Sequence, residues 1–263
     1  MSDGRELARE FLEQQRLLGG DTVILPDAAP PPAVGRSGSQ ADEKTDRPTA
    51  RLPDSPKREL PPPGISFDPP GSDLFSNDPV QRAGSLNAIA ELVASCVKCR
   101  LCEGRAHTVP GEGPADARVV VVGEGPGRVE DETGRPFVGP AGELLTKILA
   151  AIELPRERVF ICNVVKCRPP ENRAPQYDEI AACVPYLFRQ LDLLKPTVIL
   201  AMGGTAAQTL LNTKQSLGAL RNQIHRFRGI PVIVTYHPAA LLRNPNWKKP
   251  TWDDVRIARR LLA

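Results

Sequence analysis

Five of the six cysteines are spaced in a way that could bind a metal. Cys96 and Cys99 are separated by two residues, and Cys167 and Cys183 follow at a wide interval. Four thiolates can hold zinc or a four-iron cluster. Zinc ribbons usually use two close pairs, so the wide second interval favours iron–sulfur. Cys102 extends the first pair into a ferredoxin-like C-x2-C-x2-C run and could replace one of the other ligands, a choice that spacing leaves open.

A second candidate site is the glycine-rich loop Gly123-Glu124-Gly125-Pro126-Gly127. Small residues let backbone amides come close to a planar ligand or an anion, because no side chain blocks the approach. A tight turn would use the same residues for a different reason. The spacing differs from that of a dinucleotide-binding fingerprint. Gly123 and Gly125 are therefore candidate contacts to a substrate.

Phe137 and Asn163 could together recognise a nucleic-acid base. Phe137 lies in the polar segment Gly134-Arg135-Pro136-Phe137-Val138-Gly139, where it could stack on a flipped base or simply anchor the core. Asn163 ends an apolar run and offers a hydrogen-bond donor and an acceptor together. That pair suits the O4 and N3–H edge of uracil, whereas cytosine presents the opposite pattern. An asparagine capping its own turn is the alternative.

The segment from His237 to Pro245 places a histidine after another apolar run and two leucines beside Arg243. Apolar side chains next to a cation could enter a DNA base stack as a wedge. A helix that begins here and packs into the core is the other interpretation of Leu241 and Leu242. The sequence alone supports both.

These residues follow segments that alternate between strand and helix patterns. Continuous apolar runs predict strands at 118–123, 159–163, 197–202 and 231–236, and helical periodicity covers 83–95, 142–152, 177–194, 205–211 and 252–262. Strands of this kind are buried on both faces, which predicts a three-layer α/β/α sandwich with a central four-stranded parallel sheet. Ligands bind such sheets at the carboxyl ends of the strands, where the candidate residues lie.

Composition separates this domain from the residues before it. Residues 26–79 hold 13 of the 28 prolines and show no periodicity, so we expect a largely disordered leader over 1–82, with one short helix at 5–18, and a folded domain over 83–263. Residues 1–95 carry 10 Lys and Arg against 15 Asp and Glu, and residues 96–263 carry 24 against 16. A basic domain suits a polyanion, although solvated surface charge would look the same.

The same survey indicates the compartment. No apolar run approaches the roughly 18 residues of a membrane span, and the N-terminus lacks a signal-peptide core. We therefore expect a cytoplasmic protein, in which the cysteines are thiols or metal ligands and do not form disulfides. Cys162, inside an apolar run, is most simply a buried thiol. No long apolar repeat is visible, which favours a monomer.

Taken together, the motifs resemble those of one family. Cys-x2-Cys-Arg-Leu, Gly-Glu-Gly-Pro-Gly, Thr-Gly-Arg-Pro-Phe-Val-Gly, Asn-Val-Val-Lys-Cys-Arg-Pro-Pro and His-Pro-Ala-Ala-Leu-Leu-Arg-Asn-Pro occur in the order found in family 4 uracil-DNA glycosylases, from about Leu92 to the C-terminus. These enzymes hydrolyse the N-glycosidic bond of deoxyuridine in base-excision repair. The resemblance implies the same α/β/α fold, a DNA substrate that contains uracil, in single or double strands, and association with the nucleoid.

The resemblance also implies roles for individual residues. The 4Fe-4S cluster would be held by Cys96, Cys99, Cys167 and Cys183, with a structural role. Phe137 would stack on the base, Asn163 would bind its polar edge, amides near Gly123 and Gly125 would support a carbonyl oxygen, and His237 would donate to uracil O2. Leu241 is the candidate wedge, with Leu242 and Arg243 behind it. His107 and His225 fall outside the motifs and are expected to be structural or on the surface.

Two carboxylates have open roles. Glu124 is the nearest acid to the position where relatives in other families carry an aspartate, so it either handles the attacking water or holds its loop by hydrogen bonding. Glu130 matches a family position near C5 of the base, where it would reject the methyl group of thymine. A carboxylate that stabilises the start of a helix is the alternative for Glu130.

Two other functions would use much of the same sequence. A related protein that traps uracil DNA covalently on a loop histidine carries Lys-Arg-Arg-Ile-His, whereas the loop after Cys167 here reads Arg-Pro-Pro-Glu-Asn-Arg. An iron–sulfur electron carrier or sensor would explain the cysteines but leave Asn163 and His237 without a role. The leader could recruit a repair or replication partner.

Overall fold

The computed structural model describes residues 60–69 and 77–262. All of them except Leu60 belong to a compact unit that starts at Pro61. The expected helix at 5–18 and most of the expected leader lie outside the described residues. The predicted strands and helices of the domain can all be compared with the structure.

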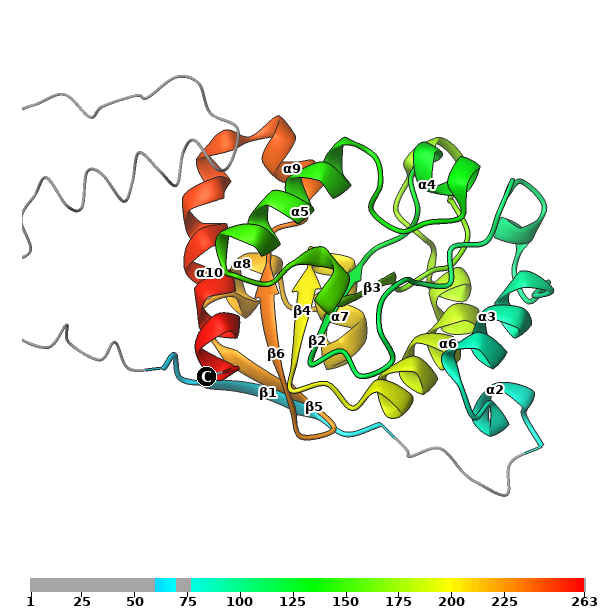
Figure 1. The fold of residues 1–263 in the computed structure, drawn as a ribbon, viewed down its shortest axis with the longest axis horizontal. Helices are drawn as coiled ribbons and strands as arrows, with labels where there is room; N and C mark the ends of the chain where they lie inside the picture. The colour runs from blue at the N-terminus through cyan, green and yellow to red at the C-terminus, as the bar shows by residue number, and fades with distance from the viewer. Residues whose placement is uncertain (1–59, 70–76, 263) are drawn as a thin grey trace, which may run out of the picture. The chain divides into compact units, whose positions relative to one another are not determined.

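A six-stranded sheet forms the centre of this unit, in the order β1-β5-β6-β4-β2-β3 (Figure 1). The strands are β1 (Pro63–Phe67), β2 (Val119–Gly123), β3 (Phe160–Asn163), β4 (Val198–Met202), β5 (Ile224–Phe227) and β6 (Ile230–Thr235). All neighbours pair in parallel except β5 and β6, which are antiparallel. The four strands predicted from apolar runs are confirmed and form the parallel part, β6-β4-β2-β3.

The helices lie where the periodicity places them, with several short additions. They are α2 (Pro79–Arg82), α3 (Leu86–Ala94), α4 (Arg128–Thr133), α5 (Pro140–Ala151), α6 (Tyr177–Leu194), α7 (Gly204–Leu211), α8 (Leu217–Leu220), α9 (Pro238–Arg243) and α10 (Lys248–Leu261). Within the described residues no helix has the length and apolar character needed to cross a membrane.

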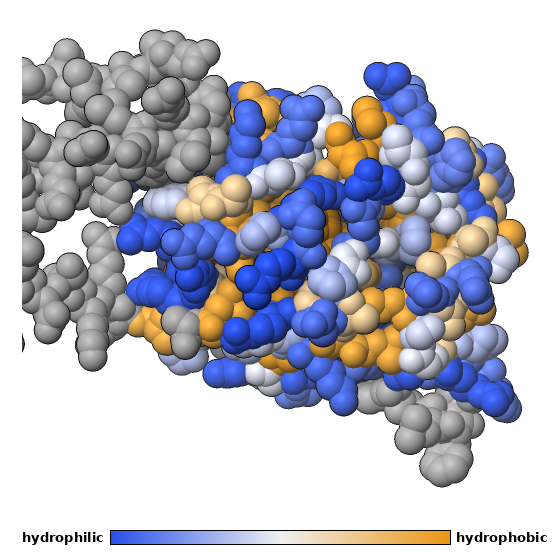
Figure 2. Space-filling view, viewed as in Figure 1, coloured by the Kyte–Doolittle hydropathy of each residue, from blue (hydrophilic) through white to orange (hydrophobic). Residues whose placement is uncertain are grey.

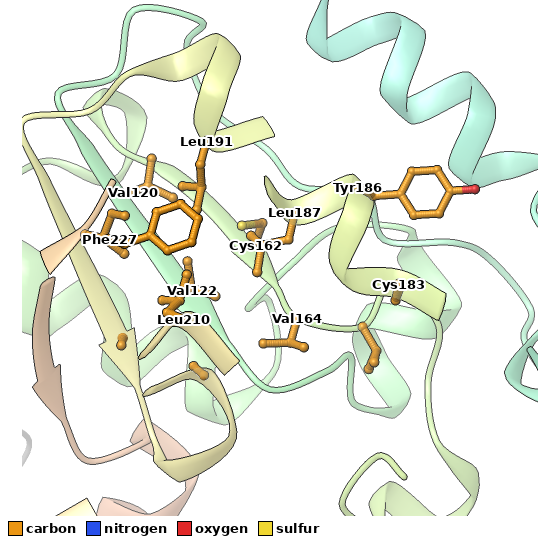
Figure 3. Close-up of a cluster of buried hydrophobic side chains, with 14 of the residues drawn as sticks. Val120, Val122, Cys162, Val164, Cys183, Tyr186, Leu187, Leu191, Leu210 and Phe227 are labelled. Atoms are coloured by element: carbon orange, nitrogen blue, oxygen red, sulfur yellow. The ribbon is translucent and has the colours of Figure 1, made fainter. Parts of the chain in front are cut away.

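Two apolar cores, one on each face of the sheet, confirm the three-layer prediction. Val119 and Val121 of β2 pack in one core together with residues of α5 and α10. Val120 and Val122 point to the opposite face, into a core that includes residues of α3, α6 and α7. Figure 3 shows part of this second core. Successive strand residues face opposite sides, so one apolar run serves both layers.

Two strands were missed by the sequence analysis, and the sheet is therefore six-stranded, not four-stranded. β5 is short, and buried and more exposed residues alternate along it. β1 begins with Pro63-Gly64, a pair that disfavours a strand prediction. β1 and α2 both precede residue 83, so the folded unit starts before the predicted boundary.

His225 explains how β1 can join the sheet. Its imidazole is buried, its Nδ1 accepts a hydrogen bond from Ile65 N at 2.8 Å, and its Nε2 donates to Leu220 O at 2.7 Å. This pattern requires the neutral tautomer with the proton on Nε2. A Cβ on Gly64 would lie 2.4 Å from His225 Nδ1, so the glycine permits the close approach. The expectation that His225 is structural is confirmed.

His107 lies on the surface, where its Nδ1 donates to Asp131 O at 3.0 Å. Figure 2 shows hydrophilic and hydrophobic residues interspersed on the viewed face. Such a mixed surface is ordinary for helices that bury one side against a sheet.

We predict that His225→Ala destabilises the domain without changing its chemistry. The substitution leaves Ile65 N and Leu220 O without these partners, which should lower the free energy of unfolding by about 1–3 kcal/mol. Urea denaturation followed by circular dichroism measures the loss, with His107→Ala as the surface control. Equal stability of His225→Ala and the wild type would show that the two hydrogen bonds of the His225 ring do not stabilise the domain.

Candidate active site

Three of the predicted site loops meet at one edge of the sheet because their strands are parallel. In the β2–β3 pair, Gly123 lies opposite Asn163, so the last residues of the two strands are direct neighbours. At the end of β4, Gly203 N donates to Thr235 O of β6 at 2.8 Å. His237 follows two residues later. The predicted convergence at the carboxyl ends is therefore confirmed.

Asn163 carries an unsatisfied hydrogen-bonding atom. The residue is 1% exposed, and its Oδ1 is buried without a hydrogen-bond partner among the described residues. A Cβ on Gly123 would lie 2.4 Å from this oxygen, so only glycine lets the Asn163 side chain lie this close to the end of β2. A buried acceptor without a donor is unfavourable, and a ligand that donates a hydrogen bond to it would remove this cost.

Phe137 packs beside the same glycine. Its Cζ would lie 2.5 Å from a Cβ on Gly123, and its ring centroid is 5.5 Å from that of His237, with the planes at 32°. Phe137 is 5% exposed and packs in the core, as the anchor interpretation expects. Stacking of the ring on a base stays a prediction.

The backbone of Phe137 is held in an unusual conformation. Its φ is 50°, in the left-handed region that non-glycine residues seldom adopt. Arg156 Nη1 donates to Phe137 O at 2.8 Å, and Nη2 donates to Pro136 O at 2.6 Å. A Cβ on Gly142 would lie 1.9 Å from Phe137 O. Arg156 and Gly142 thus fix the ring, and sequence reasoning missed both.

His237 is a neutral hydrogen-bond donor. It is the N-cap of α9, where its Nδ1 accepts from Ala239 N at 3.2 Å. The proton of the neutral ring is therefore on Nε2. Burial, aided by the charge of Arg243 and opposed by that of Glu130, lowers the pKa of His237 to about 4. The ring can donate through Nε2 without carrying a charge at neutral pH.

Glu130 joins the glycine loop to the Phe137 segment. Its Oε2 accepts from Gly127 N at 3.1 Å, while its Oε1 accepts from Val138 N at 3.0 Å and Gly139 N at 2.8 Å. Glu130 also occupies the third position of α4, where a carboxylate satisfies free amides of the helix start. Glu130 therefore does stabilise the start of a helix, as the alternative interpretation expects. The same contacts also fix the glycine loop relative to the Phe137 segment.

Glu124 is anchored to a neighbouring helix. Thr205 Oγ1 at the start of α7 donates to Glu124 Oε2 at 2.5 Å. Val165 N donates to Glu124 O at 3.1 Å, and a Cβ on Gly125 would lie 2.8 Å from a methyl carbon of Val165. These contacts support the loop-holding role of Glu124. The small size of Gly125 lets the loop pack against the segment after β3.

The wedge assignment to Leu241 is wrong. Leu241 is 0% exposed, on the helix α9, which packs against α5. A wedge has to reach DNA from the surface, and a side chain with no exposed area cannot do so while α9 stays packed. Leu242 is 50% exposed and takes its place as the candidate. Neighbouring positions on a helix face different directions, which the sequence pattern could not resolve.

The five spaced cysteines line one cavity. Cys96, Cys99, Cys102, Cys167 and Cys183 all line it. Cys99 and Cys102 are the ends of one 3₁₀ turn, in which residues three apart lie on the same face. Cys162 does not line this cavity and is buried in the core near Leu187, as Figure 3 shows.

The chemistry around the sulfurs fits metal ligands. Arg105 Nη1 donates to Cys167 Sγ at 3.4 Å, and Lys166 N donates to Cys183 Sγ at 3.3 Å. Such N–H donors stabilise thiolates that carry negative charge. Burial raises the pKa of Cys99 and Cys167, and raises that of Cys183 to about 12, so these thiols are protonated unless a metal replaces the proton.

In the described residues, no three Cys, His, Asp or Glu side chains gather closely enough to hold a single metal ion. A four-iron cluster binds each cysteine through a different iron, so its ligands stand around a larger volume than those of one ion.

The chain is similar to proteins of one family. A family model described as "Uracil DNA glycosylase superfamily" matches residues 110–257. The "Type-4 uracil-DNA glycosylase" of Sulfurisphaera tokodaii is 46% identical over 189 residues, which cover 67% of this chain and 84% of that protein. The one from Thermotoga maritima is 48% identical, covering 66% and 93%. This chain belongs to the type-4 uracil-DNA glycosylases.

A more distant relative, the "Type-5 uracil-DNA glycosylase" of Pyrobaculum aerophilum, is 31% identical over 59% of this chain and 75% of its own length. The superfamily match includes Phe137, Asn163 and His237 but begins after Cys96, Cys99 and Cys102. The resemblance found from the motifs is therefore confirmed for the family.

Sequence reasoning missed Lys166, a lysine that is 1% exposed. A signal was present, because this lysine directly follows the apolar residues Val164 and Val165 and precedes a candidate ligand. A charged residue in a buried run has to find partners, yet the sequence does not say which partners.

We predict that His237 stays neutral well below pH 6.5, its ordinary pKa. The unfolded chain takes up this proton near pH 6.5 and the folded chain only near 4, so stability from this group is complete above 6.5 and is lost as pH falls towards 4. Nitrogen NMR of the histidine rings, assigned with His237→Gln, measures the titration. A ring that titrates near 6.5 would contradict the inferred burial.

Proposed function

We propose that the space bordered by Gly123, Phe137, Asn163 and His237 binds a uracil turned out of DNA, and that the chain hydrolyses the N-glycosidic bond of that nucleotide. The products are free uracil and an abasic site. The observation that carries this proposal is the buried, unpartnered Oδ1 of Asn163, which lies against Gly123 at the ends of β2 and β3.

Asn163 selects the base by its hydrogen-bonding edge. Its Oδ1 accepts from uracil N3–H, and its Nδ2 donates to O4. Cytosine has an acceptor at N3 and a donor at N4, so it would face like groups across both contacts. Phe137 stacks on the ring and Glu130, through the amides it holds, keeps the walls near C5 too close for the methyl group of thymine.

His237 supports the leaving group. As the bond to the sugar breaks, negative charge grows on uracil O2, and a hydrogen bond from His237 Nε2–H strengthens with that charge. A neutral imidazole is suited to this role because it can donate a hydrogen bond without burying a positive charge. Backbone amides near Gly125 add further donors. Glu124, although anchored by Thr205, is the nearest carboxylate for orienting the water.

We assign a 4Fe-4S cluster to Cys96, Cys99, Cys167 and Cys183, whose cavity and N–H donors suit it. When bound, the cluster supplies four metal–thiolate bonds that cross-link the segments around it. Cys96 and Cys99 follow α3, Cys167 follows β3, and Cys183 lies in α6. Three elements are thereby held together beside the loop that follows Asn163.

The experiment that tests base recognition compares Gly123→Ala and Asn163→Ala with Gly204→Ala. A Cβ at Gly123 would lie 2.4 Å from Asn163 Oδ1 and displace it, whereas one at Gly204 meets nothing within 4 Å. We expect uracil excision to fall by at least about a hundredfold in the first two variants and to be unchanged in the third, since oriented polar contacts contribute about that much to such reactions.

Single-turnover cleavage of matched oligonucleotides with one uracil, thymine or hypoxanthine, scored by alkaline cleavage at the abasic site, measures the rates. Full activity of Gly123→Ala would place the base elsewhere. Binding of uracil DNA by the wild type without cleavage would favour the binding protein considered above, and neither binding nor cleavage would overturn the proposed activity.

For the cluster, we expect about four iron atoms per wild-type chain. We predict that Cys99→Ala and Cys183→Ala lose the visible absorbance and most of this iron, because one ligand is missing. Cys162→Ala is the matched control, since this cysteine lies outside the cavity. Iron and sulfide analysis after anaerobic purification measures the content. Retention in Cys183→Ala together with loss in Cys102→Ala would assign the fourth ligand to Cys102.

For the wedge, we predict that Leu242→Ala slows excision from double-stranded DNA about three- to tenfold and affects single-stranded DNA less. Unstacking a base step costs about a few kcal/mol, part of which an inserted side chain offsets. Leu60→Ala removes the same atoms from a leucine that is 51% exposed and serves as the control. Equal losses on both substrates would argue against a wedge.

A further inference from the structure

Lys166 is among the most deeply buried side chains of the described domain. It is 1% exposed, and its Nζ donates to Asn163 O at 2.8 Å and to Gln190 Oε1 at 2.7 Å. Gln190, on α6, is also 1% exposed and donates through Nε2 to Pro110 O at 2.8 Å. A buried chain of polar groups thus runs from the end of β3 to α6 and the loop before β2.

The backbone of the same residue belongs to the cysteine cavity. Lys166 N donates to Cys183 Sγ at 3.3 Å, Lys166 O accepts from Val109 N at 2.8 Å, and Cys167 follows directly. Lys166 itself lines the cavity. One residue therefore contacts a proposed cluster ligand through its backbone and the base-recognising asparagine through its side chain.

Packing alone does not explain a lysine at this position. Burying an ammonium group is unfavourable unless its partners compensate, and an apolar side chain of similar length would fill the same volume at lower cost. Val164 and Val165, which precede it, are both buried and apolar. The specific consequence of the lysine is that it fixes one atom, the carbonyl oxygen of Asn163.

We propose that Lys166 is a positioning residue for uracil excision, which acts by holding the backbone of Asn163 so that its amide side chain faces the base. The inference rests on the role proposed above for Asn163. It adds that the cysteine cavity and the base site are joined through Lys166. The ammonium group touches neither the base nor the sugar.

A double-mutant cycle tests this link, because the effects of substituting two residues that act through one contact are not additive. Lys166→Met, Asn163→Ala and the double variant are compared in single-turnover excision of uracil, and iron and sulfide are measured in each preparation. Lys214→Met, an exposed lysine after α7, is the matched control. Gln190→Met keeps the ammonium group, removes one acceptor and serves if Lys166→Met does not fold.

We expect Lys166→Met to slow excision at least about tenfold per iron-loaded chain, with unchanged affinity for DNA that lacks uracil, and to add no loss in the Asn163→Ala background. Gln190→Met should show a smaller loss of the same kind. If Lys166→Met slowed excision equally in the wild-type and Asn163→Ala backgrounds, the inference would be overturned. Activity that falls only in proportion to the iron content would overturn it as well. An Asn163→Ala variant with full activity would instead refute the role of Asn163, and with it the premise.

Discussion

The pairing of Gly123 with Asn163 at the ends of β2 and β3 is the constraint on which the rest of the site depends. Parallel pairing brings the two residues together, and the missing side chain of Gly123 lets the Asn163 oxygen and the Phe137 ring pack against the end of β2. The other residues of the proposed site are placed relative to this pair. The Phe137 ring closes one side, and the His237 ring lies 5.5 Å from it.

Polar groups hold the proposed site in place, and each uses its partners differently. Glu130 accepts three backbone amides and joins two loops. Lys166 donates to one carbonyl and one amide oxygen and keeps the end of β3 in position. His237 is instead kept neutral by burial, which leaves its Nε2–H free to respond to charge on a ligand. Charged residues thus hold the backbone of the proposed site, while the histidine in it is neutral.

The cysteine cavity lies on the same side of the sheet as α3 and α6, whose apolar residues pack in the core shown in Figure 3. A cluster there would act on the base site through the short segment from Asn163 to Cys167. That segment has few ways to move, since Val164 N and Val165 N donate to Gly123 O and Glu124 O. A structural role for the cluster is consistent with this short, tightly bonded connection.

The sequence by itself determined the four parallel strands, the main helices, the family, and the residues at the strand ends, because apolar periodicity and motif order are local properties. Only the tertiary structure decided that Leu241 is buried and Leu242 exposed, that Pro63–Phe67 joins the sheet through His225, and that Lys166 is held by Asn163 and Gln190. These outcomes depend on contacts between residues far apart in the chain or on the direction a helix faces, and neither is encoded in a local pattern.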